Sequence, residues 1–355
     1  MGKGHQIRKH QTRVGGRHPV QTAEAVTMVF ARRDFLHLTL GAVACASVLS
    51  AALALDYPTR PVTIIVPFAA GGPADITGRI VGEQLAKRLG QQFIIENVNG
   101  AGGTIGATRA ARATPDGYTL IIGHMGTHAA APALYPDLAY DPAEDFAPIG
   151  LVAEFPEVLV TRKDFPARTL KDFVAYAKAN QSKLNMAHAG VGSVSYVGCL
   201  LLNTAIGIKP TLVPFTGSAP ATNALMAGQV DYFCDPIIGQ LAQISAGNVH
   251  ALAIAAAARH PLLADVPTAA EEGLPQFNIA PFFALFAPKG TPQSVVDVLA
   301  AALNQTLDDP VASKRFAELG AAIAEKGRRG PAPLDALVRS EIARLTPILK
   351  AAAQK

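Results

Sequence analysis

The sequence predicts an α/β protein built from two lobes. Beyond residue 55, short runs rich in β-branched residues alternate with helical stretches, an order typical of open, largely parallel sheets with helices on both faces. These strand–helix units are too numerous for one compact sheet, so we expect two sheets and two cores. Half of the 355 residues are hydrophobic and 16% are charged, which excludes an intrinsically disordered chain.

The first predicted units open with a buried strand at 62–67, rich in valine and isoleucine. A helix from Pro73 to Leu89 follows a glycine-rich loop. Its apolar residues recur at helical spacing, proline suits its first turn, and Gly90 suits its end. The next predicted elements are a strand at 93–97, a glycine-rich segment at 100–106 leading into a helix to about 113, and a strand at 118–122.

The alternation continues to the C-terminus. Thr169 is a candidate cap for a helix at 170–178, and a loop of small residues at 187–195 opens another helix. The remaining predicted elements are strands at 158–160, 211–215, 230–234, 251–255 and 282–287, a helix at 219–227, and a mostly helical tail from 292.

The basic excess of the chain lies at its N-terminus. The formal net charge is +4, from 31 basic and 27 acidic residues. Residues 1–54 hold seven basic and two acidic residues, which leaves 24 basic and 25 acidic residues for positions 55–355. A nearly neutral body argues against nucleic-acid binding, which requires a basic face.

This N-terminal segment is predicted to be an export signal over residues 28–54. Arg32 and Arg33 precede an uncharged apolar stretch, and Ala52-Leu53-Ala54 fits the pattern read by signal peptidase. The paired arginines favour a twin-arginine signal, and an ordinary secretory signal stays open. We expect cleavage near Ala54, with residues 1–27 a non-native or unstructured extension.

Several strands are followed by loops rich in glycine, serine and threonine, at 68–75, 123–128, 188–195 and 215–219. In open α/β sheets a ligand lies beyond the C-terminal ends of the strands. Backbone N–H groups and helix N-termini there favour an anion, most simply a carboxylate. No run of arginine or lysine lines these loops, so binding would rely on neutral donors. Asp75 either complements its helix dipole or organises its loop.

The other motifs carry weaker signals. Loop 100–106 resembles a dinucleotide fingerprint, but no acidic residue ends the following strand, so a structural turn is favoured. His124 and His128 have a spacing that metal ligands use, without a cysteine or carboxylate cluster. Ser193 and Ser195 do not lie in the G-x-S-x-G motif of a nucleophile elbow. We therefore expect no catalytic residue, no metal and no cofactor. Spacing does not decide whether Cys199 and Cys234 pair.

A set of motifs in order along the chain resembles the Bug-type (TctC-like) solute-binding proteins of tripartite tricarboxylate transporters. The motifs are Tyr57-Pro58-x-Arg60-Pro61, Pro67-Phe68-x-x-Gly71-Gly72-x-x-Asp75, Glu96-Asn97-x-x-Gly100-Ala101-Gly102-Gly103-x-Ile105-Gly106, Pro115-Asp116-Gly117-Tyr118, Phe215-Thr216-Gly217-Ser218-Ala219-Pro220, Ala227-Gly228-Gln229-Val230-Asp231, Asp265-Val266-Pro267-Thr268 and Glu272-Gly273-Leu274-Pro275.

The resemblance implies a periplasmic binding protein of the type II fold, with two α/β lobes joined by two crossover strands and a ligand cleft between them. Lobe 1 would comprise 55–155 with 280–355, and lobe 2 would comprise 156–279. Carried onto this sequence, the ligand-binding residues would be Phe68, Ala69, Ala70, Asp75, Thr127, Gly190, Gly192, Ser193, Ser195, Thr216, Gly217, Ala219 and Asp235. His188 departs from the family pattern, and His188 or His124 would be placed to meet a second carboxylate.

The leading hypothesis is a monomeric, non-catalytic periplasmic protein. It would capture a small carboxylate, preferably a dicarboxylate, and deliver it to the large and small membrane subunits of a transporter. Two alternatives stay open on the sequence. One is an exported NAD(P)-dependent oxidoreductase, based on loop 100–106 and the paired arginines. The other is a carboxylate-sensing subunit of a signalling system.

Overall fold

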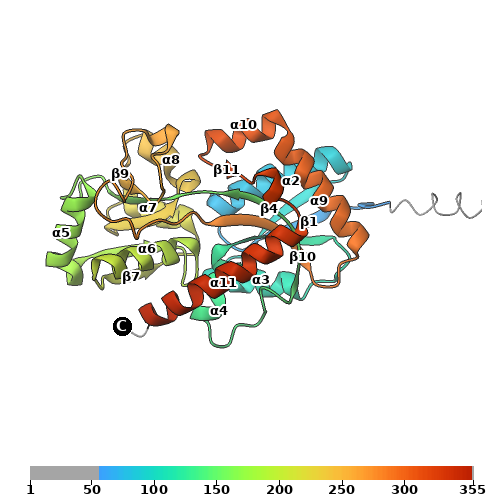
Figure 1. Cartoon of the computed structure of the whole chain (residues 1–355), viewed down its shortest axis with the longest axis horizontal. Helices are drawn as coiled ribbons and strands as arrows, with labels where there is room; N and C mark the ends of the chain where they lie inside the picture. The colour runs from blue at the N-terminus through green and yellow to red at the C-terminus, as the bar shows by residue number, and fades with distance from the viewer. Residues whose placement is uncertain (1–55, 354–355) are drawn as a thin grey trace, which may run out of the picture. The chain divides into compact units, whose positions relative to one another are not determined.

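The computed structural model describes residues 56–353, which form two lobes, each built on one mixed sheet with helices packed against it (Figure 1). The predicted export signal, its cleavage near Ala54 and the extension at 1–27 lie outside the described residues. No helix between residues 56 and 353 combines the length and the apolar character needed to cross a membrane.

Lobe 1 is built on a six-stranded sheet with the order β11-β4-β10-β3-β1-β2. Its strands are β1 (Val62–Val66), β2 (Phe93–Asn97), β3 (Thr119–His124), β4 (Phe146–Glu154), β10 (Phe282–Pro288) and β11 (Ala322–Ile323). Its helices are α2 (Pro73–Leu89), η1 (Ala101–Gly103), α3 (Thr104–Ala111), η2 (Gly126–Ala130), α4 (Ala131–Leu134), α9 (Gln293–Asp308), α10 (Pro310–Glu318), η5 (Lys326–Arg328) and α11 (Pro331–Ala353).

Lobe 2 is built on a five-stranded sheet with the order β7-β6-β8-β5-β9. Its strands are β5 (Glu157–Arg162), β6 (Asn185–His188), β7 (Thr211–Pro214), β8 (Tyr232–Pro236) and β9 (Val249–Ile254). Its helices are α5 (Leu170–Asn180), η3 (Gln181–Lys183), α6 (Val194–Ile206), α7 (Ser218–Met226), α8 (Ile237–Ser245) and η4 (Pro261–Leu263).

The expectation of largely parallel sheets is wrong, because both sheets are mixed. In lobe 1, β1 is parallel to β2 and β3, whereas β10 is antiparallel to β3 and β4. In lobe 2, β6 is parallel to β7 and β8, whereas β5 is antiparallel to β8 and β9. The chain leaves lobe 1 between Glu154 and Glu157 and returns before Phe282. A strand that arrives from the other lobe enters the sheet against the direction of the βα units, which explains the mixture.

Local signals in the sequence account for the helix ends. Pro73 occupies the first turn of α2, and Gly90 ends it in the left-handed conformation at φ 72°. Thr169 caps α5, because its side chain accepts a hydrogen bond from the backbone N–H of Asp172. The structure also contains elements that the sequence reasoning missed, namely β4, β6 and α8.

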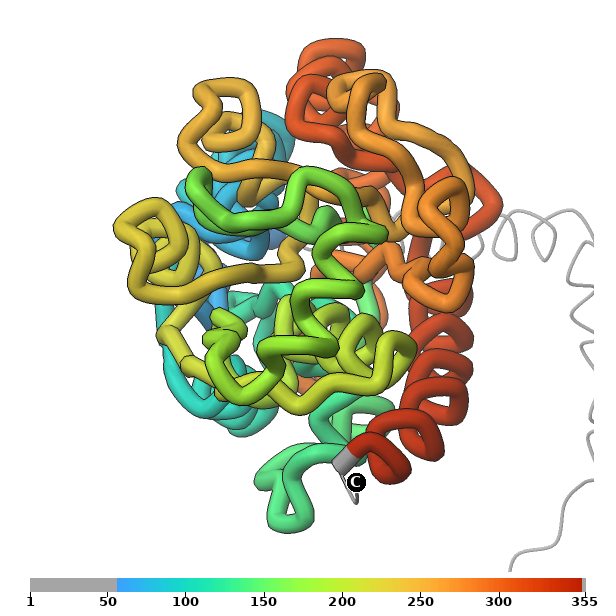
Figure 2. Tube along the Cα trace, turned by 90° about the vertical axis from the view of Figure 1, so that its left-hand side faces the viewer, coloured from blue at the N-terminus to red at the C-terminus, as the bar shows by residue number. Residues whose placement is uncertain are grey.

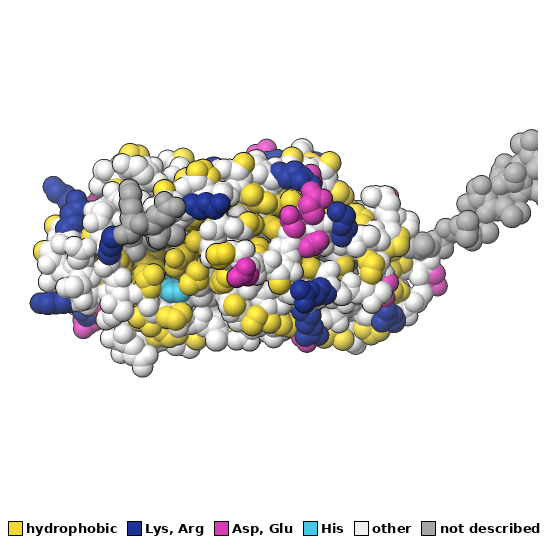
Figure 3. Space-filling view, turned by 90° about the horizontal axis from the view of Figure 1, so that it is seen from below, with side chains coloured by type: hydrophobic (Ala, Val, Ile, Leu, Met, Phe, Trp, Pro, Cys, Tyr) yellow, Lys and Arg dark blue, Asp and Glu magenta, His cyan; other side chains and the backbone are white. Residues whose placement is uncertain are grey.

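Helix α11 connects the two lobes on the outside. It packs against β4, η2 and α4 of lobe 1 and reaches α6 of lobe 2. Figure 2 looks onto lobe 2 and shows α11 in red beside the green and yellow segments. On the face drawn in Figure 3, the Lys and Arg side chains are interspersed with Asp and Glu side chains, so this face carries no continuous basic field.

Candidate functional site

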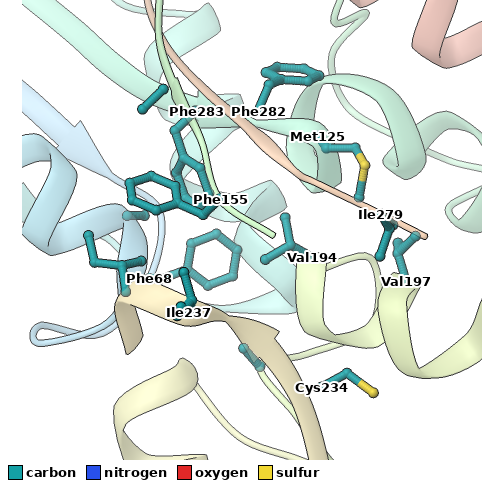
Figure 4. Close-up of a cluster of buried hydrophobic side chains, with 14 of the residues drawn as sticks. Phe68, Met125, Phe155, Val194, Val197, Cys234, Ile237, Ile279, Phe282 and Phe283 are labelled. Atoms are coloured by element: carbon teal, nitrogen blue, oxygen red, sulfur yellow. The ribbon is translucent and has the colours of Figure 1, made fainter. Parts of the chain in front are cut away.

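A cavity with a volume of about 20 Å³ lies where the two lobes meet. Lobe 1 contributes Phe68, the start of α2, His124 on β3 and Phe283 on β10, and lobe 2 contributes the starts of α6 and α7. Figure 4 shows the surrounding apolar cluster, with Phe68 and Phe283 from lobe 1 and Val194 and Ile237 from lobe 2. The cavity is lined by Phe68, Gly72, Pro73, Ala74, His124, Ala189, Ser193, Val194, Ser218 and Phe283.

Three helices begin at this cavity. Helix α2 follows the C-terminal end of β1, α6 follows β6, and α7 follows β7. The first N–H groups of a helix have no partner within it, and the helix dipole places partial positive charge at this end. The three N-termini therefore offer an anion uncharged donors from both lobes. The lining contains no lysine or arginine.

His124 adds an uncharged donor to the lining. Its ring stacks on Phe68 with centroids 4.8 Å apart. Its Nδ1 accepts hydrogen bonds from the backbone N–H groups of Gly126 (3.0 Å) and Thr127 (3.3 Å), so the ring proton resides on Nε2. Burial lowers the pKa of His124 to about 3, which keeps the ring neutral.

Asp75 organises the loop at the start of α2 and does not line the cavity. Its Oδ2 accepts hydrogen bonds from the backbone N–H of Gly71 and from Arg79, both at 2.9 Å. Its Oδ1 accepts one from Asn97, whose amide also donates to the carbonyl oxygen of Phe68. Burial alone would raise the pKa of Asp75, but these hydrogen bonds lower it overall, so the carboxylate stays ionised.

A buried acidic group lies behind the lobe 2 side of the cavity. The Ser218 hydroxyl donates to Asp235 Oδ1 at 2.7 Å, and the Gln240 amide donates to Asp235 Oδ2 at 2.9 Å. Burial raises the pKa of Asp235 to about 7, although both hydrogen bonds oppose the shift. Glu157 is also fully buried, and neither of its carboxyl oxygens has a hydrogen-bond partner. Burial and the nearby Asp235 raise the pKa of Glu157 well above its usual value.

The two lobes touch around the cavity. The backbone N–H of Ala69 donates to the carbonyl oxygen of Thr216 at 3.2 Å, and the Tyr135 hydroxyl donates to the carbonyl oxygen of Val191 at 2.7 Å. Gly102 lies so close to Val191 that a Cβ there would be 1.6 Å from its carbonyl oxygen. These contacts bridge the two lobes beside the cavity.

The residues expected at the ligand divide into three groups by position. Phe68 and Ser193 line the cavity. Gly190 and Thr216 line a wider neighbouring groove with a volume of about 520 Å³, at the same lobe interface. The others support these loops or lie outside the cavity: Ala69 and Gly217 are in contact, Ala219 lies near Gly71, Gly192 lies near Gly126, Thr127 bonds His124, Ser195 bonds Ser193, Asp235 bonds Ser218, and Ala70 is exposed.

Sequence reasoning did not place several lining residues at the ligand. Ser218 begins α7, one residue before the predicted start of that helix. Phe283 reaches the cavity from β10, the strand that returns to lobe 1. No local pattern in the sequence indicates that Phe283 lies at the cavity. His188 does not line the cavity, because its Nδ1 accepts a hydrogen bond from the backbone N–H of Gly190 and its ring contacts Tyr196.

The remaining motifs have structural roles. Gly106 packs against the carbonyl oxygen of Val98 and against Pro67, so the glycine-rich loop is a tight turn. His128 stacks on Phe286 with centroids 4.0 Å apart. Within residues 56–353, no three His, Cys, Asp or Glu side chains gather as a metal site. Cys199 and Cys234 are buried free thiols.

Comparison with known proteins adds the family context. A family model described as a tripartite tricarboxylate transporter family receptor matches residues 77–353. MatC from Rhodopseudomonas palustris with bound malate is 48% identical, with a TM-score of 0.81, over 82% of this chain and 100% of that chain. The periplasmic binding protein BugD is 40% identical, with a TM-score of 0.81, over 84% and 99%. An R. palustris protein with adipate is 34% identical, with a TM-score of 0.80, over 84% and 98%.

Proposed function

Because this chain belongs to the tripartite tricarboxylate transporter receptor family, we propose that it captures a small dicarboxylate between its lobes and delivers it to the membrane subunits of such a transporter. The family comprises periplasmic binding proteins rather than enzymes, and this chain shares that class. The proposal concerns the ligand and the partner of this particular chain.

One observation carries the proposal, namely the convergence of three helix N-termini on one cavity between the lobes. A carboxylate accepts hydrogen bonds from such N–H groups and is favoured by the dipoles behind them. The N-terminus of α2 faces the cavity from lobe 1, and those of α6 and α7 face it from lobe 2. A molecule with one carboxylate at each end is stabilised by both lobes at once, which favours closure.

The residues that line the cavity support a dicarboxylate. Phe68, Val194 and Phe283 provide apolar contacts for a short carbon chain between two charged ends. No arginine or lysine lines the cavity to neutralise a third carboxylate. Two relatives of this fold hold malate and adipate, both dicarboxylates.

Calorimetric titration tests the proposal with malate, adipate, citrate and acetate. We expect the two dicarboxylates to bind more tightly than acetate or citrate. Val194→Asp places a negative charge in the cavity and should abolish binding, whereas Val311→Asp, at a side chain 70% exposed, should preserve it. The proposal is wrong if no carboxylate binds, or if both variants bind equally well.

Several narrower expectations belong to the same proposal. We propose lobe boundaries at 55–155 with 280–355 and at 156–279, a twin-arginine signal cleaved near Ala54, and a monomer.

Co-purification with large and small membrane subunits would distinguish a transporter receptor from a carboxylate-sensing subunit. Recovery with a membrane kinase instead would support the sensor.

A further inference from the structure

The hydroxyl group of Ser218 has one proton, which it can donate either to the carboxylate of Asp235 or to a ligand oxygen in the cavity. Ser218 lines the cavity, and its hydroxyl donates to Asp235 Oδ1 at 2.7 Å. While Asp235 is ionised, it takes this hydrogen bond, and the serine oxygen presents only lone pairs towards the cavity. A carboxylate ligand has only acceptors, so these lone pairs repel it. The hydroxyl cannot donate a hydrogen bond to the ligand and to an ionised Asp235 at the same time.

The surroundings of Asp235 favour its protonated form. Glu157 on β5 and the thiols of Cys199 on α6 and Cys234 on β8 are the titratable groups near it. Helices α7 and α8 provide the hydroxyls of Ser218 and Thr222 and the amide of Gln240, and α2 of lobe 1 approaches with Pro73. Within residues 56–353, no arginine, lysine or histidine forms an ion pair with Asp235.

We propose that carboxylate capture is coupled to the uptake of one proton by Asp235, which turns the Ser218 hydroxyl towards the ligand. The protonated Asp235 donates to Ser218 Oγ, and the Ser218 hydroxyl then donates to a ligand oxygen. The proton comes from solvent, the ligand keeps its charge, and no covalent bond of the ligand changes. Asp235 is a positioning residue because it acts through Ser218. This inference rests on the proposed function and adds its regulation by pH.

The direction of the pH dependence follows from linkage. The ligand-bound form holds the proton more tightly than the free form, so affinity for a fully ionised ligand rises as pH falls. Burial raises the pKa of Asp235 to about 7 in the ligand-free protein. We therefore expect uptake of about half a proton near pH 7 and nearly one near pH 8, with the Kd increasing up to about tenfold per pH unit above this range.

Calorimetric titration with malate, in buffers of different ionisation enthalpy and at several pH values, measures both the Kd and the number of protons taken up on binding. Malate is fully ionised above about pH 6, so the ligand does not contribute its own protons. D235N cannot ionise and should show a flat Kd and no proton uptake. E157Q is the matched control, because it replaces the neighbouring buried acid and should keep the wild-type slope. S193A removes a cavity hydroxyl bonded to Ser195 and should weaken binding without changing the slope.

The outcomes separate this inference from the proposed function. Malate binding without proton uptake, or a D235N variant with the wild-type slope, overturns the coupling and leaves the receptor function intact. Absence of binding by any carboxylate at every pH overturns both. If D235N does not fold, proton uptake by the wild-type protein still decides the matter, and S218A should show a much shallower slope.

Discussion

The hydroxyl of Tyr135 in lobe 1 donates a hydrogen bond to the carbonyl oxygen of Val191 in lobe 2, across 2.7 Å. The same hydroxyl lies 2.9 Å from the carbonyl oxygen of Ala101, in the glycine-rich turn of lobe 1. One side chain therefore links that turn to the loop of lobe 2 that precedes α6. This bond to lobe 2 exists only when the lobes are closed, so it stabilises the closed state selectively.

Tyr135→Phe should weaken ligand binding by removing this hydrogen bond. A bond worth about 1 kcal/mol in the closed state corresponds to a roughly fivefold increase in Kd. Titration calorimetry with malate measures the change. Tyr118→Phe is the control, because the Tyr118 hydroxyl bonds to Thr59 within lobe 1. Equal Kd values for wild type and Tyr135→Phe would show that this bond does not stabilise the closed state.

Gly102→Ala should prevent closure, whereas Gly90→Ala should not. Both glycines have positive φ, 62° and 72°, so alanine adds similar backbone strain of about 1 kcal/mol at each. Only at Gly102 would the new Cβ meet the other lobe, 1.6 Å from the Val191 carbonyl oxygen, since nothing lies within 4 Å at Gly90. We expect similar losses of unfolding free energy, with affinity reduced about tenfold or more only in Gly102→Ala. Similar ligand affinities in the two variants would contradict this account.

The buried His128 should make the protein less stable in acid. Burial lowers the pKa of His128 to about 3, whereas an unfolded histidine binds a proton below about 6.5. Stability is therefore lost as pH falls from about 6.5 towards 3, by about 1.4 kcal/mol per pH unit. His128→Phe should remove this contribution. Denaturant unfolding at several pH values measures the slopes, and a His128→Phe variant with the wild-type slope would contradict the prediction.

Cys199 and Cys234 should be unreactive towards thiol reagents in the folded protein. Burial raises the pKa of both thiols, and the Cys199 sulfur accepts a hydrogen bond from the backbone N–H of Cys234 at 3.0 Å. The reactive thiolate is therefore scarce as well as inaccessible. We expect both thiols to react with Ellman's reagent only after denaturation. Fast labelling of Cys199 or Cys234 in the native protein would refute the prediction, and a lack of thiols at both positions after denaturation would indicate a disulfide instead.

The sequence predicts the local elements better than their directions. Runs such as 62–66 and the apolar spacing of α2 depend on neighbouring residues, so they are visible in the sequence. The strand β6, with the sequence Asn-Met-Ala-His, is short and has no β-branched residue, which explains why it was missed. The mixed direction of the sheets depends on β5 and β10 pairing with distant strands, and local patterns carry no information about this.

As with the fold, the sequence predicts the local features of the candidate site better than the contacts between distant residues. Loops after strands and helix starts are local features, so the sequence indicates them, and the starts of α2, α6 and α7 line the cavity. That an anion binds there stays a prediction. The role of Ser218 depends on Asp235 standing behind it, which requires α7 and β8 to be packed together. Likewise, the tautomer of His124 depends on the turn of the backbone at Gly126 and Thr127, and no spacing rule specifies this turn.

The position of β10 between β4 and β3 has a consequence for the order in which the protein can be built during synthesis. All strands of lobe 2 come from one continuous stretch, from β5 to β9, so its sheet is complete before β10 has been translated. The sheet of lobe 1 stays divided at its middle until β10 arrives, although its first strand, β1, is made long before. The sheet that begins with β1 can therefore be completed only after β10 has been translated. A nascent chain interrupted before Phe282 contains all strands of the lobe 2 sheet but only part of the lobe 1 sheet.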